Sequence, residues 1–321
     1  MQPKQIIVTI PVKERHKAYL ESKAPDARFL YTSAQNITDD ELDKANIIIG
    51  NVPPKRLHSP AALEWMQLNS AGSDNYCAPG VLSPRTILTN ATGAYGLAIS
   101  EYMLAVSLQI QNKLFLYRDN QRNHLWKDEG EVTSIEGSTT LVIGLGDIGG
   151  SYARKMKALG SYTIGIRRTA TNKPDYLDEL YSMDSLDEVL PRADFIALSL
   201  PNSPATYRII NETRLRAMKK TAILINVGRG TAIDTDALVR VLNDGHLAGC
   251  AVDVTDPEPL PPDHPLWDAR NMVITPHSSG SYHLPETFER IVRIAGENLE
   301  AFLAEKPMRN VVDFSTGYRK R

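Results

Sequence analysis

The first ninety residues contain short apolar runs that alternate with polar or helix-forming stretches. Five of these runs are rich in β-branched or aromatic residues and are expected to be strands: 6–10, 28–32, 46–50, 65–70 and 86–90. Helix-forming stretches separate several of them, for example 13–23 and 39–45. Strands that alternate with helices are typical of a parallel sheet with crossover helices. The pattern therefore predicts a first α/β domain.

A second alternating block begins near residue 140 and has a clearer pattern. Six apolar runs are expected to be strands: 140–143, 162–166, 194–198, 222–226, 249–254 and 271–275. The expected helices between them are 148–159, 185–190, 211–218 and 235–243. Asp234 suits the N-cap of the last of these helices, and Gly245 suits the stop after it. Six apolar runs with crossovers predict one doubly wound parallel sheet.

Two helical segments link these blocks. Residues 93–126 carry apolar positions at helical spacing and predict one long helix, with or without a break. Residues 285–306 predict an amphipathic helix with Pro285 in its first turn, and the run 310–314 predicts a strand or an extended tail. We therefore expect a Rossmann-type domain at 101–281, inserted into a flavodoxin-like domain made of 1–100 and 282–321. The chain would pass between the two domains twice, which predicts a hinge at these crossings. Closure of the domains about such a hinge would exclude water from the space between them.

Composition and net charge limit the kinds of partner and compartment that are expected for this protein. The chain has 321 residues, enough for about two domains, with 42% hydrophobic and 23% charged residues. A net charge of −2 predicts neither a nucleic-acid partner nor an anionic membrane partner. Cys77 and Cys250 form no disulfide or metal-binding pattern, so no metal is expected. The chain lacks an apolar run of about 18 residues, and a cytoplasmic protein is expected.

The strand at 140–143 runs directly into a glycine-rich G-x-G-x-x-G segment. In this pattern the first glycine permits a tight turn, the second lets the backbone approach a pyrophosphate, and the third allows close helix packing. The following helix offers free amides and a positive dipole end to phosphates. The alternative is a glycine turn that serves packing alone. The surrounding strands favour dinucleotide binding by Gly144, Gly146, Asp147, Ile148 and Gly149.

The residues after the next strand bear on cofactor choice. An acidic side chain there accepts hydrogen bonds from a ribose 2′-hydroxyl, whereas an arginine accommodates a 2′-phosphate. This chain has Arg167, Arg168 and Thr169 at that place. Two guanidiniums and a hydroxyl suit a dianionic phosphate, and a solvated basic loop is the alternative. The sequence therefore predicts NADP as the preferred cofactor, with NAD as the second option.

Three segments at the ends of late strands carry candidate chemistry, because open α/β sheets bind ligands at that edge. They are residues 225–230, 254–260 and 274–280, which contain Arg229, Glu258 and His277. Hydride transfer to a ketone needs a proton donor, and histidine is the usual one. A neighbouring carboxylate favours the imidazolium and orients the ring, while an arginine fork binds a planar carboxylate. Taken singly, each residue has a structural alternative: a strand-end histidine, a solvated loop acid, or an arginine that caps a helix or pairs with Asp234.

In their order and spacing, NVGRG, DPEPL and TPHSSG resemble the D-isomer-specific 2-hydroxyacid dehydrogenase family. The resemblance covers nearly the whole chain and implies the same roles for Arg229, Glu258 and His277. It also implies a D-2-hydroxy acid product and a homodimer. The apolar segment 97–116 independently favours the homodimer, as a candidate interface. Many members of the family carry Asp where this chain has Arg167, so the expected NADP preference comes from this sequence alone.

The resemblance suggests further contacts. It places the substrate carboxylate on the backbone of Ser70, Ala71 and Gly72, with Asn51 as a neighbouring candidate, and it places Asp253 near the nicotinamide amide. The other candidates for cofactor contact are Pro201, Thr206, Val227 and Gly280. Candidates for the walls of the substrate pocket, with packing or surface positions as the alternative, are Tyr95, Trp126, Tyr282 and His283.

The expected function is reduction of a 2-keto acid by NADPH. Glyoxylate, hydroxypyruvate or a bulkier 2-keto acid all fit the residues. The alternative from another class is a dinucleotide-sensing binding protein like the corepressors of this family, which can retain the same three residues. A corepressor would carry extra interaction segments, and the sequence has none.

Overall fold

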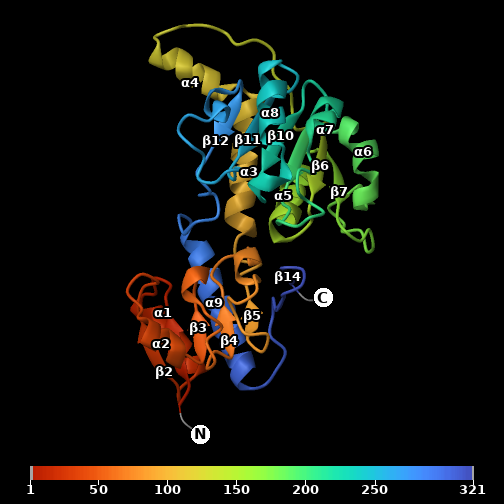
Figure 1. Cartoon of the computed structure of the whole chain (residues 1–321). Coiled ribbons are helices and arrows are strands. Elements are labelled where there is room, and N and C mark those ends of the chain that lie inside the picture. Colours follow the sequence, from red (N-terminus) through yellow and green to blue (C-terminus); the bar gives the residue numbers. More distant parts are fainter. Residues whose placement is uncertain (1–2, 320–321) are drawn as a thin grey trace. The chain divides into compact units, whose positions relative to one another are not determined.

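The computed structural model describes residues 3–319 and divides the chain into two compact units. Unit 1 consists of Met1–Tyr95 and Tyr282–Arg321, and unit 2 consists of Gly96–Ser281. Each unit has its own parallel sheet, with five strands in unit 1 and seven in unit 2 (Figure 1). These sheets confirm the predicted α/β class. Among residues 3–319, no helix has both the length and the apolar content needed to cross a membrane.

The sheet of unit 1 has the order β2-β1-β3-β4-β5 and parallel pairing throughout. Its strands are β1 (Gln5–Val8), β2 (Arg28–Tyr31), β3 (Ile47–Ile49), β4 (Trp65–Gln67) and β5 (Ile87–Thr89). Its helices are α1 (Glu14–Lys23), α2 (Asp39–Lys44) and α9 (Pro285–Leu303). Thr38 caps α2 by accepting a hydrogen bond from the Glu41 amide. Pro285 opens α9, as predicted, but the helix ends at Leu303 rather than at the expected residue 306.

Helices cover both faces of this sheet. On one face α1 and α9 pack side by side, and Trp65 of β4 stacks on Phe302 of α9 with ring centroids 5.4 Å apart. On the other face Ile48 and Met66 join an apolar cluster that includes Leu42 of α2. Because both faces are covered, β3 is buried along its whole length. The run expected at 310–314 supplies β13 (Val312–Asp313), which pairs antiparallel with β14 (Tyr318–Arg319).

The sheet of unit 2 has the order β12-β11-β10-β9-β6-β7-β8, again parallel. Its strands are β6 (Thr139–Ile143), β7 (Tyr162–Ile166), β8 (Glu179–Tyr181), β9 (Phe195–Leu198), β10 (Ile223–Asn226), β11 (Gly249–Val252) and β12 (Met272–Ile274). The sequence pattern predicted six strands and missed β8. This edge strand has only three residues, all half-buried, so its apolar signal is weak.

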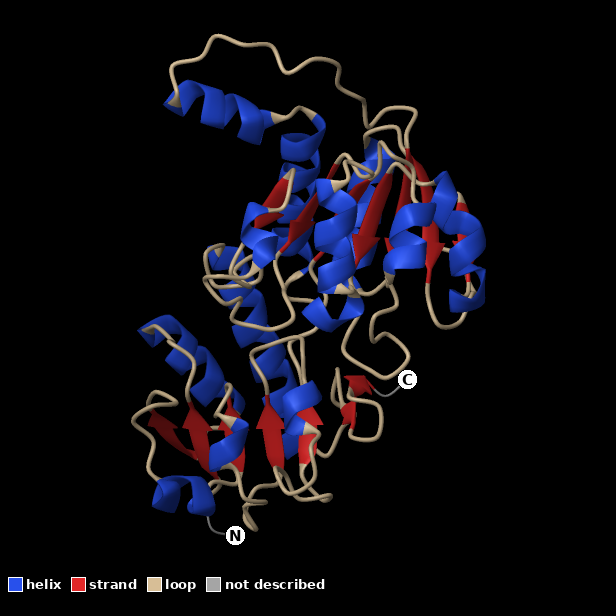
Figure 2. Cartoon of the chain, turned by 45° about the horizontal axis from the view of Figure 1, so that its top comes forward, coloured by secondary structure: helices blue, strands red, loops and turns tan. Residues whose placement is uncertain are grey.

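Unit 2 has helices on both faces of its sheet. They are α3 (Gly96–Gln111), α4 (Leu114–Arg122), α5 (Asp147–Ala158), α6 (Leu186–Val189), α7 (Glu212–Ala217) and α8 (Thr235–Asn243). Helices α3 and α5 pack together over one face, and α6, α7 and α8 bury their apolar sides over the other. The segment expected as one long helix breaks between α3 and α4 at Lys113, whose φ is +56°. Figure 2 shows α4 and the loop after it extending away from the sheet.

Candidate active site

The loop after β10 is shaped by the buried side chain of Asn226. Its Oδ1 accepts a hydrogen bond from the Gly228 amide at 3.0 Å, and its Nδ2 donates to the Arg229 carbonyl at 2.9 Å. The half-buried Arg229 guanidinium donates to the Gly228 carbonyl at 2.9 Å. Asn226 therefore fixes the backbone from which Arg229 projects. Sequence reasoning did not assign Asn226 a role, although an asparagine that ends a buried strand was the available signal.

The two glycines beside Arg229 permit close contact with neighbouring loops. A Cβ added to Gly228 would lie 2.3 Å from the Leu200 carbonyl oxygen, in the loop after β9. A Cβ added to Gly230 would lie 2.0 Å from the Thr255 carbonyl carbon, in the loop after β11. No side chain fits at either distance. The two glycines therefore allow the loop after β10 to pack directly against the loops after β9 and β11.

His277 and Glu258 lie together at this edge. The Nδ1 atom of His277 is 2.6 Å from Oε1 of Glu258, and both side chains are nearly half exposed. A carboxylate at Nδ1 accepts a hydrogen bond from that nitrogen and fixes the orientation of the ring. The His277 backbone is held in the left-handed region, with φ at +49°, and its amide donates to the Asp253 carbonyl at 2.8 Å. This geometry holds the imidazole in one orientation at a surface open to solvent.

Asp253, at the end of β11, organises the loop that carries His277. Its buried carboxylate accepts hydrogen bonds from the Thr275 hydroxyl at 2.6 Å and from the Ser278 amide at 2.9 Å. The amide and hydroxyl of Ser279 donate to the same carboxylate. The structure thus gives Asp253 a role in the loop itself. A contact with the nicotinamide remains a prediction.

Tyr102 of α3 supports the same loop and was not found from the sequence. Its hydroxyl lies 2.7 Å from the Thr275 hydroxyl. Burial raises the pKa of Tyr102 to about 12, so the phenol stays protonated at neutral pH. Within a long apolar helix, one tyrosine carries no signal that separates this role from packing.

The three glycines of the G-x-G-x-x-G segment have different surroundings. Gly144 has φ at +99°, and an added Cβ would lie 2.4 Å from the Ser199 carbonyl oxygen. A Cβ at Gly149 would lie 2.0 Å from the Gly144 carbonyl oxygen, so turn and helix are in close contact. At Gly146, by contrast, a Cβ would meet nothing within 4 Å. Packing explains the first and third glycines, whereas the open space at the second suits a bound pyrophosphate.

Asp147 and Ile148 follow at the start of α5, and both are half-buried. The Asp147 carboxylate accepts a hydrogen bond from the Gly96 amide at 2.7 Å, so it caps the beginning of α3. The side chain of Asp147 is thus engaged within unit 2. Any phosphate contact of this residue would have to come from its backbone amide.

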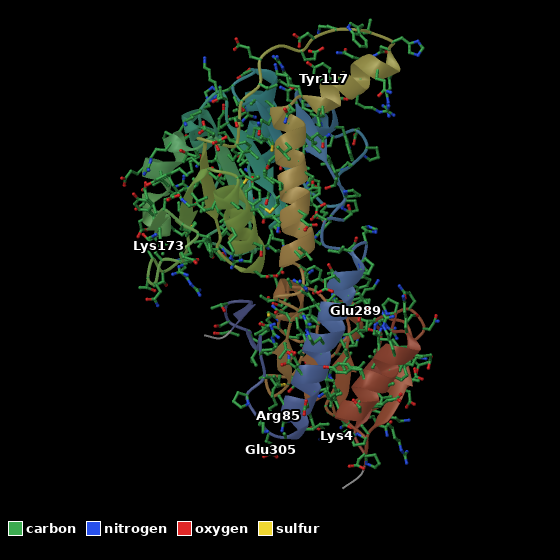
Figure 3. All side chains as sticks on the ribbon, turned by 180° about the vertical axis from the view of Figure 1, so that it is seen from behind. Lys4, Arg85, Tyr117, Lys173, Glu289 and Glu305 are labelled. Atoms are coloured by element: carbon green, nitrogen blue, oxygen red, sulfur yellow. The ribbon has the colours of Figure 1, made fainter. Side chains whose placement is uncertain are left out.

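The loop between β7 and β8 holds the candidates for cofactor choice. Arg167 is half-buried and donates from Nη2 to the Asn172 carbonyl at 3.1 Å, whereas Arg168 and Thr169 are exposed. The Nε atom of Arg167 is buried and makes no hydrogen bond in the structure. Lys173, labelled in Figure 3, donates to the Leu177 carbonyl in the same loop. The basic groups are therefore held on a folded loop.

The other cofactor candidates lie at the same edge of the sheet. Thr206 is buried and donates to the Pro201 carbonyl at 2.7 Å, which closes the loop after β9. Val227 is buried and directly follows β10, and Gly280 is half-buried in the loop that follows His277. The structure thus places all four beside strand ends of unit 2.

In unit 1, Asn51 and Asn69 bridge the loops after β3 and β4. The Asn51 amide donates to the Asn69 side chain at 2.7 Å, and the Asn69 amide donates to the Asn51 side chain at 3.0 Å. Asn51 Nδ2 also donates to the Ser70 hydroxyl, which donates to the Gly72 carbonyl. Ser70, Ala71 and Gly72 are all half-buried. The structure therefore joins Asn51 to the predicted substrate loop.

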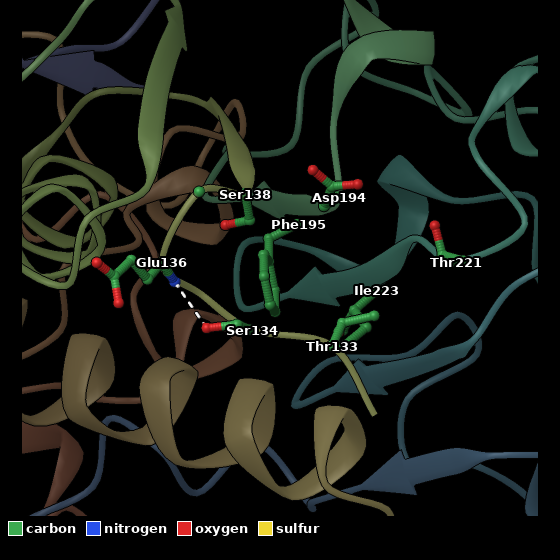
Figure 4. A pocket seen from close by; sticks show the side chains of 9 residues that line it. Thr133, Ser134, Glu136, Ser138, Asp194, Phe195, Thr221 and Ile223 are labelled. Atoms are coloured by element: carbon green, nitrogen blue, oxygen red, sulfur yellow. Dashed lines mark hydrogen bonds between the residues drawn. The ribbon is translucent and has the colours of Figure 1, made fainter. Parts of the chain in front are cut away.

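A small pocket of about 200 Å³ lies elsewhere in unit 2 (Figure 4). Phe195 and Ile223, which begin β9 and β10, line it together with Asp194 and Ser138. It is therefore at the amino ends of the strands, opposite the edge that carries His277. Among residues 3–319, no cluster of three or more His, Cys, Asp or Glu side chains is suited to a metal ion.

Comparisons with known proteins agree over most of the chain. Residues 104–279 match the family model described as "D-isomer specific 2-hydroxyacid dehydrogenase, NAD binding domain". A glyoxylate reductase of Aeropyrum pernix is 39% identical over 308 residues, which cover 92% of this chain and 85% of that protein. A structure of a D-isomer-specific 2-hydroxyacid dehydrogenase family protein from Aeromonas salmonicida is 30% identical, with a TM-score of 0.86 and coverage of 98% of this chain and 100% of that chain.

A further solved structure is similar in fold. It is an NADPH-dependent glyoxylate/hydroxypyruvate reductase from Sinorhizobium meliloti, in complex with NADP and sulfate. It is 24% identical to this chain, with a TM-score of 0.82, and the match covers 98% of this chain and all of that chain.

Proposed function

The chain belongs to the D-isomer-specific 2-hydroxyacid dehydrogenase family, and from this premise we propose that it reduces small 2-keto acids with NADPH to D-2-hydroxy acids. At the level of the family, it is an NAD(P)-dependent 2-hydroxyacid dehydrogenase, that is, a 2-keto acid reductase. Glyoxylate is the first substrate to test, because several relatives are glyoxylate reductases. The observation that carries the proposal is the 2.6 Å contact between His277 and Glu258.

The three candidate residues supply what ketone reduction requires of the protein. Bound NADPH would supply the hydride to the carbonyl carbon. His277 then donates its Nε2 proton to the carbonyl oxygen, which completes the hydroxyl group, and it regains a proton from solvent. Glu258 stabilises the imidazolium and orients the ring. Arg229 binds the substrate carboxylate and polarises the carbonyl through its guanidinium.

The preference for NADPH rests on the loop after β7. Arg167, Arg168 and Thr169 offer positive charge and a hydroxyl where a 2′-phosphate would be bound. The Arg167 Nε atom is buried and makes no hydrogen bond in the structure, so the charge of the loop, rather than this atom, supports the proposal.

We further propose that the enzyme is a homodimer that uses the segment from α4 to residue 132. Leu114, Leu125 and Trp126 are large apolar side chains with more than half of their surface exposed. Tyr117 of α4, labelled in Figure 3, lies in the same segment. Contiguous exposed apolar residues are typical of protein interfaces. Light scattering on the wild type should give about twice the chain mass of 35.6 kDa, and Leu125→Asp should shift the protein toward the monomer.

Substrate and cofactor are tested together by NADPH oxidation. The purified enzyme is assayed with glyoxylate, hydroxypyruvate and a bulkier 2-keto acid, each with NADPH and with NADH. The proposal predicts turnover of at least one 2-keto acid, with higher kcat/KM for NADPH. Absence of turnover with every acid and either cofactor would contradict it.

A further inference from the structure

The two places where the chain passes between the units are bonded to one residue, Asn69. The first crossing lies between Tyr95 and Gly96, and the second lies between Ser281 and Tyr282. The Tyr95 hydroxyl donates to the Asn69 carbonyl, and Asn69 Nδ2 donates to the Tyr282 hydroxyl. On the unit 1 side, the residue next to each crossing is therefore a tyrosine that is hydrogen-bonded to the loop after β4.

The orientation of the Asn69 amide is fixed by its other partner. Asn69 Oδ1 accepts from the backbone amide of Asn51, which can only donate. Nδ2 is therefore the atom that faces Tyr282. Tyr95 is only 6% exposed, and the Tyr282 ring packs edge-on against Phe288 with centroids 5.1 Å apart. Burial raises the pKa of both tyrosine hydroxyls, so they stay protonated and able to donate at neutral pH.

On the unit 2 side of each crossing, the chain is hydrogen-bonded to a loop that is predicted to bind cofactor or substrate. The Gly96 amide donates to Asp147 of the glycine-rich segment at 2.7 Å. The amide and hydroxyl of Ser281 donate to the Ser278 carbonyl at 3.1 and 2.9 Å, one residue after His277. Each crossing is therefore fixed within two residues on both sides.

We propose that Asn69 is a positioning residue that couples the substrate loop, residues 70–72, to both crossing segments. An anion bound by the amides of that loop would order its backbone, and Asn69 would transmit this order to Tyr95 and Tyr282. Coupling of this kind is reciprocal, so loosening either tyrosine should also loosen the loop. The substrate part of this inference rests on the proposed function.

The test uses Tyr95→Phe, Tyr282→Phe and the double variant, which remove only hydroxyl groups. Tyr152→Phe is the matched control: its buried hydroxyl lies 2.8 Å from the Ser107 hydroxyl within unit 2. Amide hydrogen exchange of the ligand-free protein is measured at residues 69–72, 95–97 and 281–283. Each tyrosine variant should speed exchange at 69–72 about threefold to tenfold, the range for one hydrogen bond. The control should leave these segments unchanged.

Kinetics provide the second readout. The double variant should raise the KM for glyoxylate about tenfold while NADPH binding stays within about twofold. Asn69→Ala removes the Nδ2 donor to Tyr282 but keeps the backbone carbonyl that accepts from Tyr95, so it should speed exchange at 69–72 and 281–283 more than at 95–97. Wild-type exchange at 69–72 in the double variant would overturn the coupling, whatever the turnover. Lack of turnover by the wild type would instead count against the proposed function, so the two failures can be distinguished.

Discussion

In unit 1, the loops after β3 and β4 are held by neutral groups, since Asn51 and Asn69 exchange backbone and side-chain hydrogen bonds. In unit 2, the buried Asp253 carboxylate holds the loop after β12, whose His277 contacts Glu258 in the loop after β11. Neutral amides can present a backbone to an anion without competing for it, whereas proton transfer needs groups that titrate. This difference is the basis of our proposal that unit 1 positions the substrate and unit 2 performs the chemistry.

The largest expected effect is at the proton donor of unit 2. His277→Ala should lower kcat for glyoxylate reduction about 10³-fold, because general acid catalysis typically contributes about 10²–10⁴. NADPH affinity, measured by fluorescence titration, should change less than about twofold. His246→Ala is the matched control, because the His246 imidazole contacts the Met218 carbonyl near α7, outside the candidate site. A near-normal kcat in His277→Ala would show that His277 is not the proton donor.

Charge reversal in the loop after β7 should have the next largest effect. Arg167→Asp should lower kcat/KM for NADPH about 10²-fold and spare or improve the value for NADH, because hydrogen bonds to a charged phosphate are worth about 1.5–3 kcal/mol. Arg85→Asp changes the net charge equally at an exposed site of unit 1 (Figure 3) and serves as the control. An unchanged ratio between the cofactors would exclude Arg167 as the determinant.

Asp253→Asn tests whether the charge of that carboxylate holds the loop of His277. An amide has one acceptor oxygen and would turn an N–H toward other donors, so we expect a loss of about 2 kcal/mol in unfolding free energy. The kcat should fall about tenfold or more. Asp187→Asn, at an exposed ion pair with Arg214, should cost at most about 0.5 kcal/mol in urea denaturation. Normal stability with selectively weaker NADPH binding would favour a nicotinamide contact instead.

The smallest effect is expected in unit 1. Asn51→Ala removes the acceptor for the Asn69 amide and the donor to Ser70. The KM for glyoxylate should rise about fivefold and the unfolding free energy should fall by about 1 kcal/mol, with kcat little changed. Asn36→Ala, at an exposed position, is the control. A fall in kcat as large as that of His277→Ala would break the division of roles between the units.

The regular parts of the fold could be predicted from the sequence because the signals are local. Buried strands such as β3 and β9 are continuous apolar runs, and Asp234 caps α8 as its position indicated. The position of the break at Lys113 and the short strand β8 could not be predicted, since a left-handed residue and a half-buried edge strand leave weak patterns.

For the candidate site, the sequence indicated the residues proposed to do the chemistry. It did not indicate the residues whose hydrogen bonds position the loops that carry them. His277, Glu258 and Arg229 stand out because their residue types suit the chemistry. Asn226 acts locally, through hydrogen bonds to Gly228 and Arg229. Asn69 and Tyr102 act through hydrogen bonds to partners that the fold brings close, such as Tyr282, which is 213 residues away from Asn69. Such pairings are tertiary, and a single sequence does not contain them.

The most direct test of the account is transfer of deuterium from NADPH labelled at the reactive C4 position to glyoxylate. The account predicts glycolate with one deuterium at C2 for each NADPH consumed, and about 10³-fold slower formation of that product by His277→Ala. Consumption of NADPH without deuterium in the product, or equal rates in the two proteins, would contradict it.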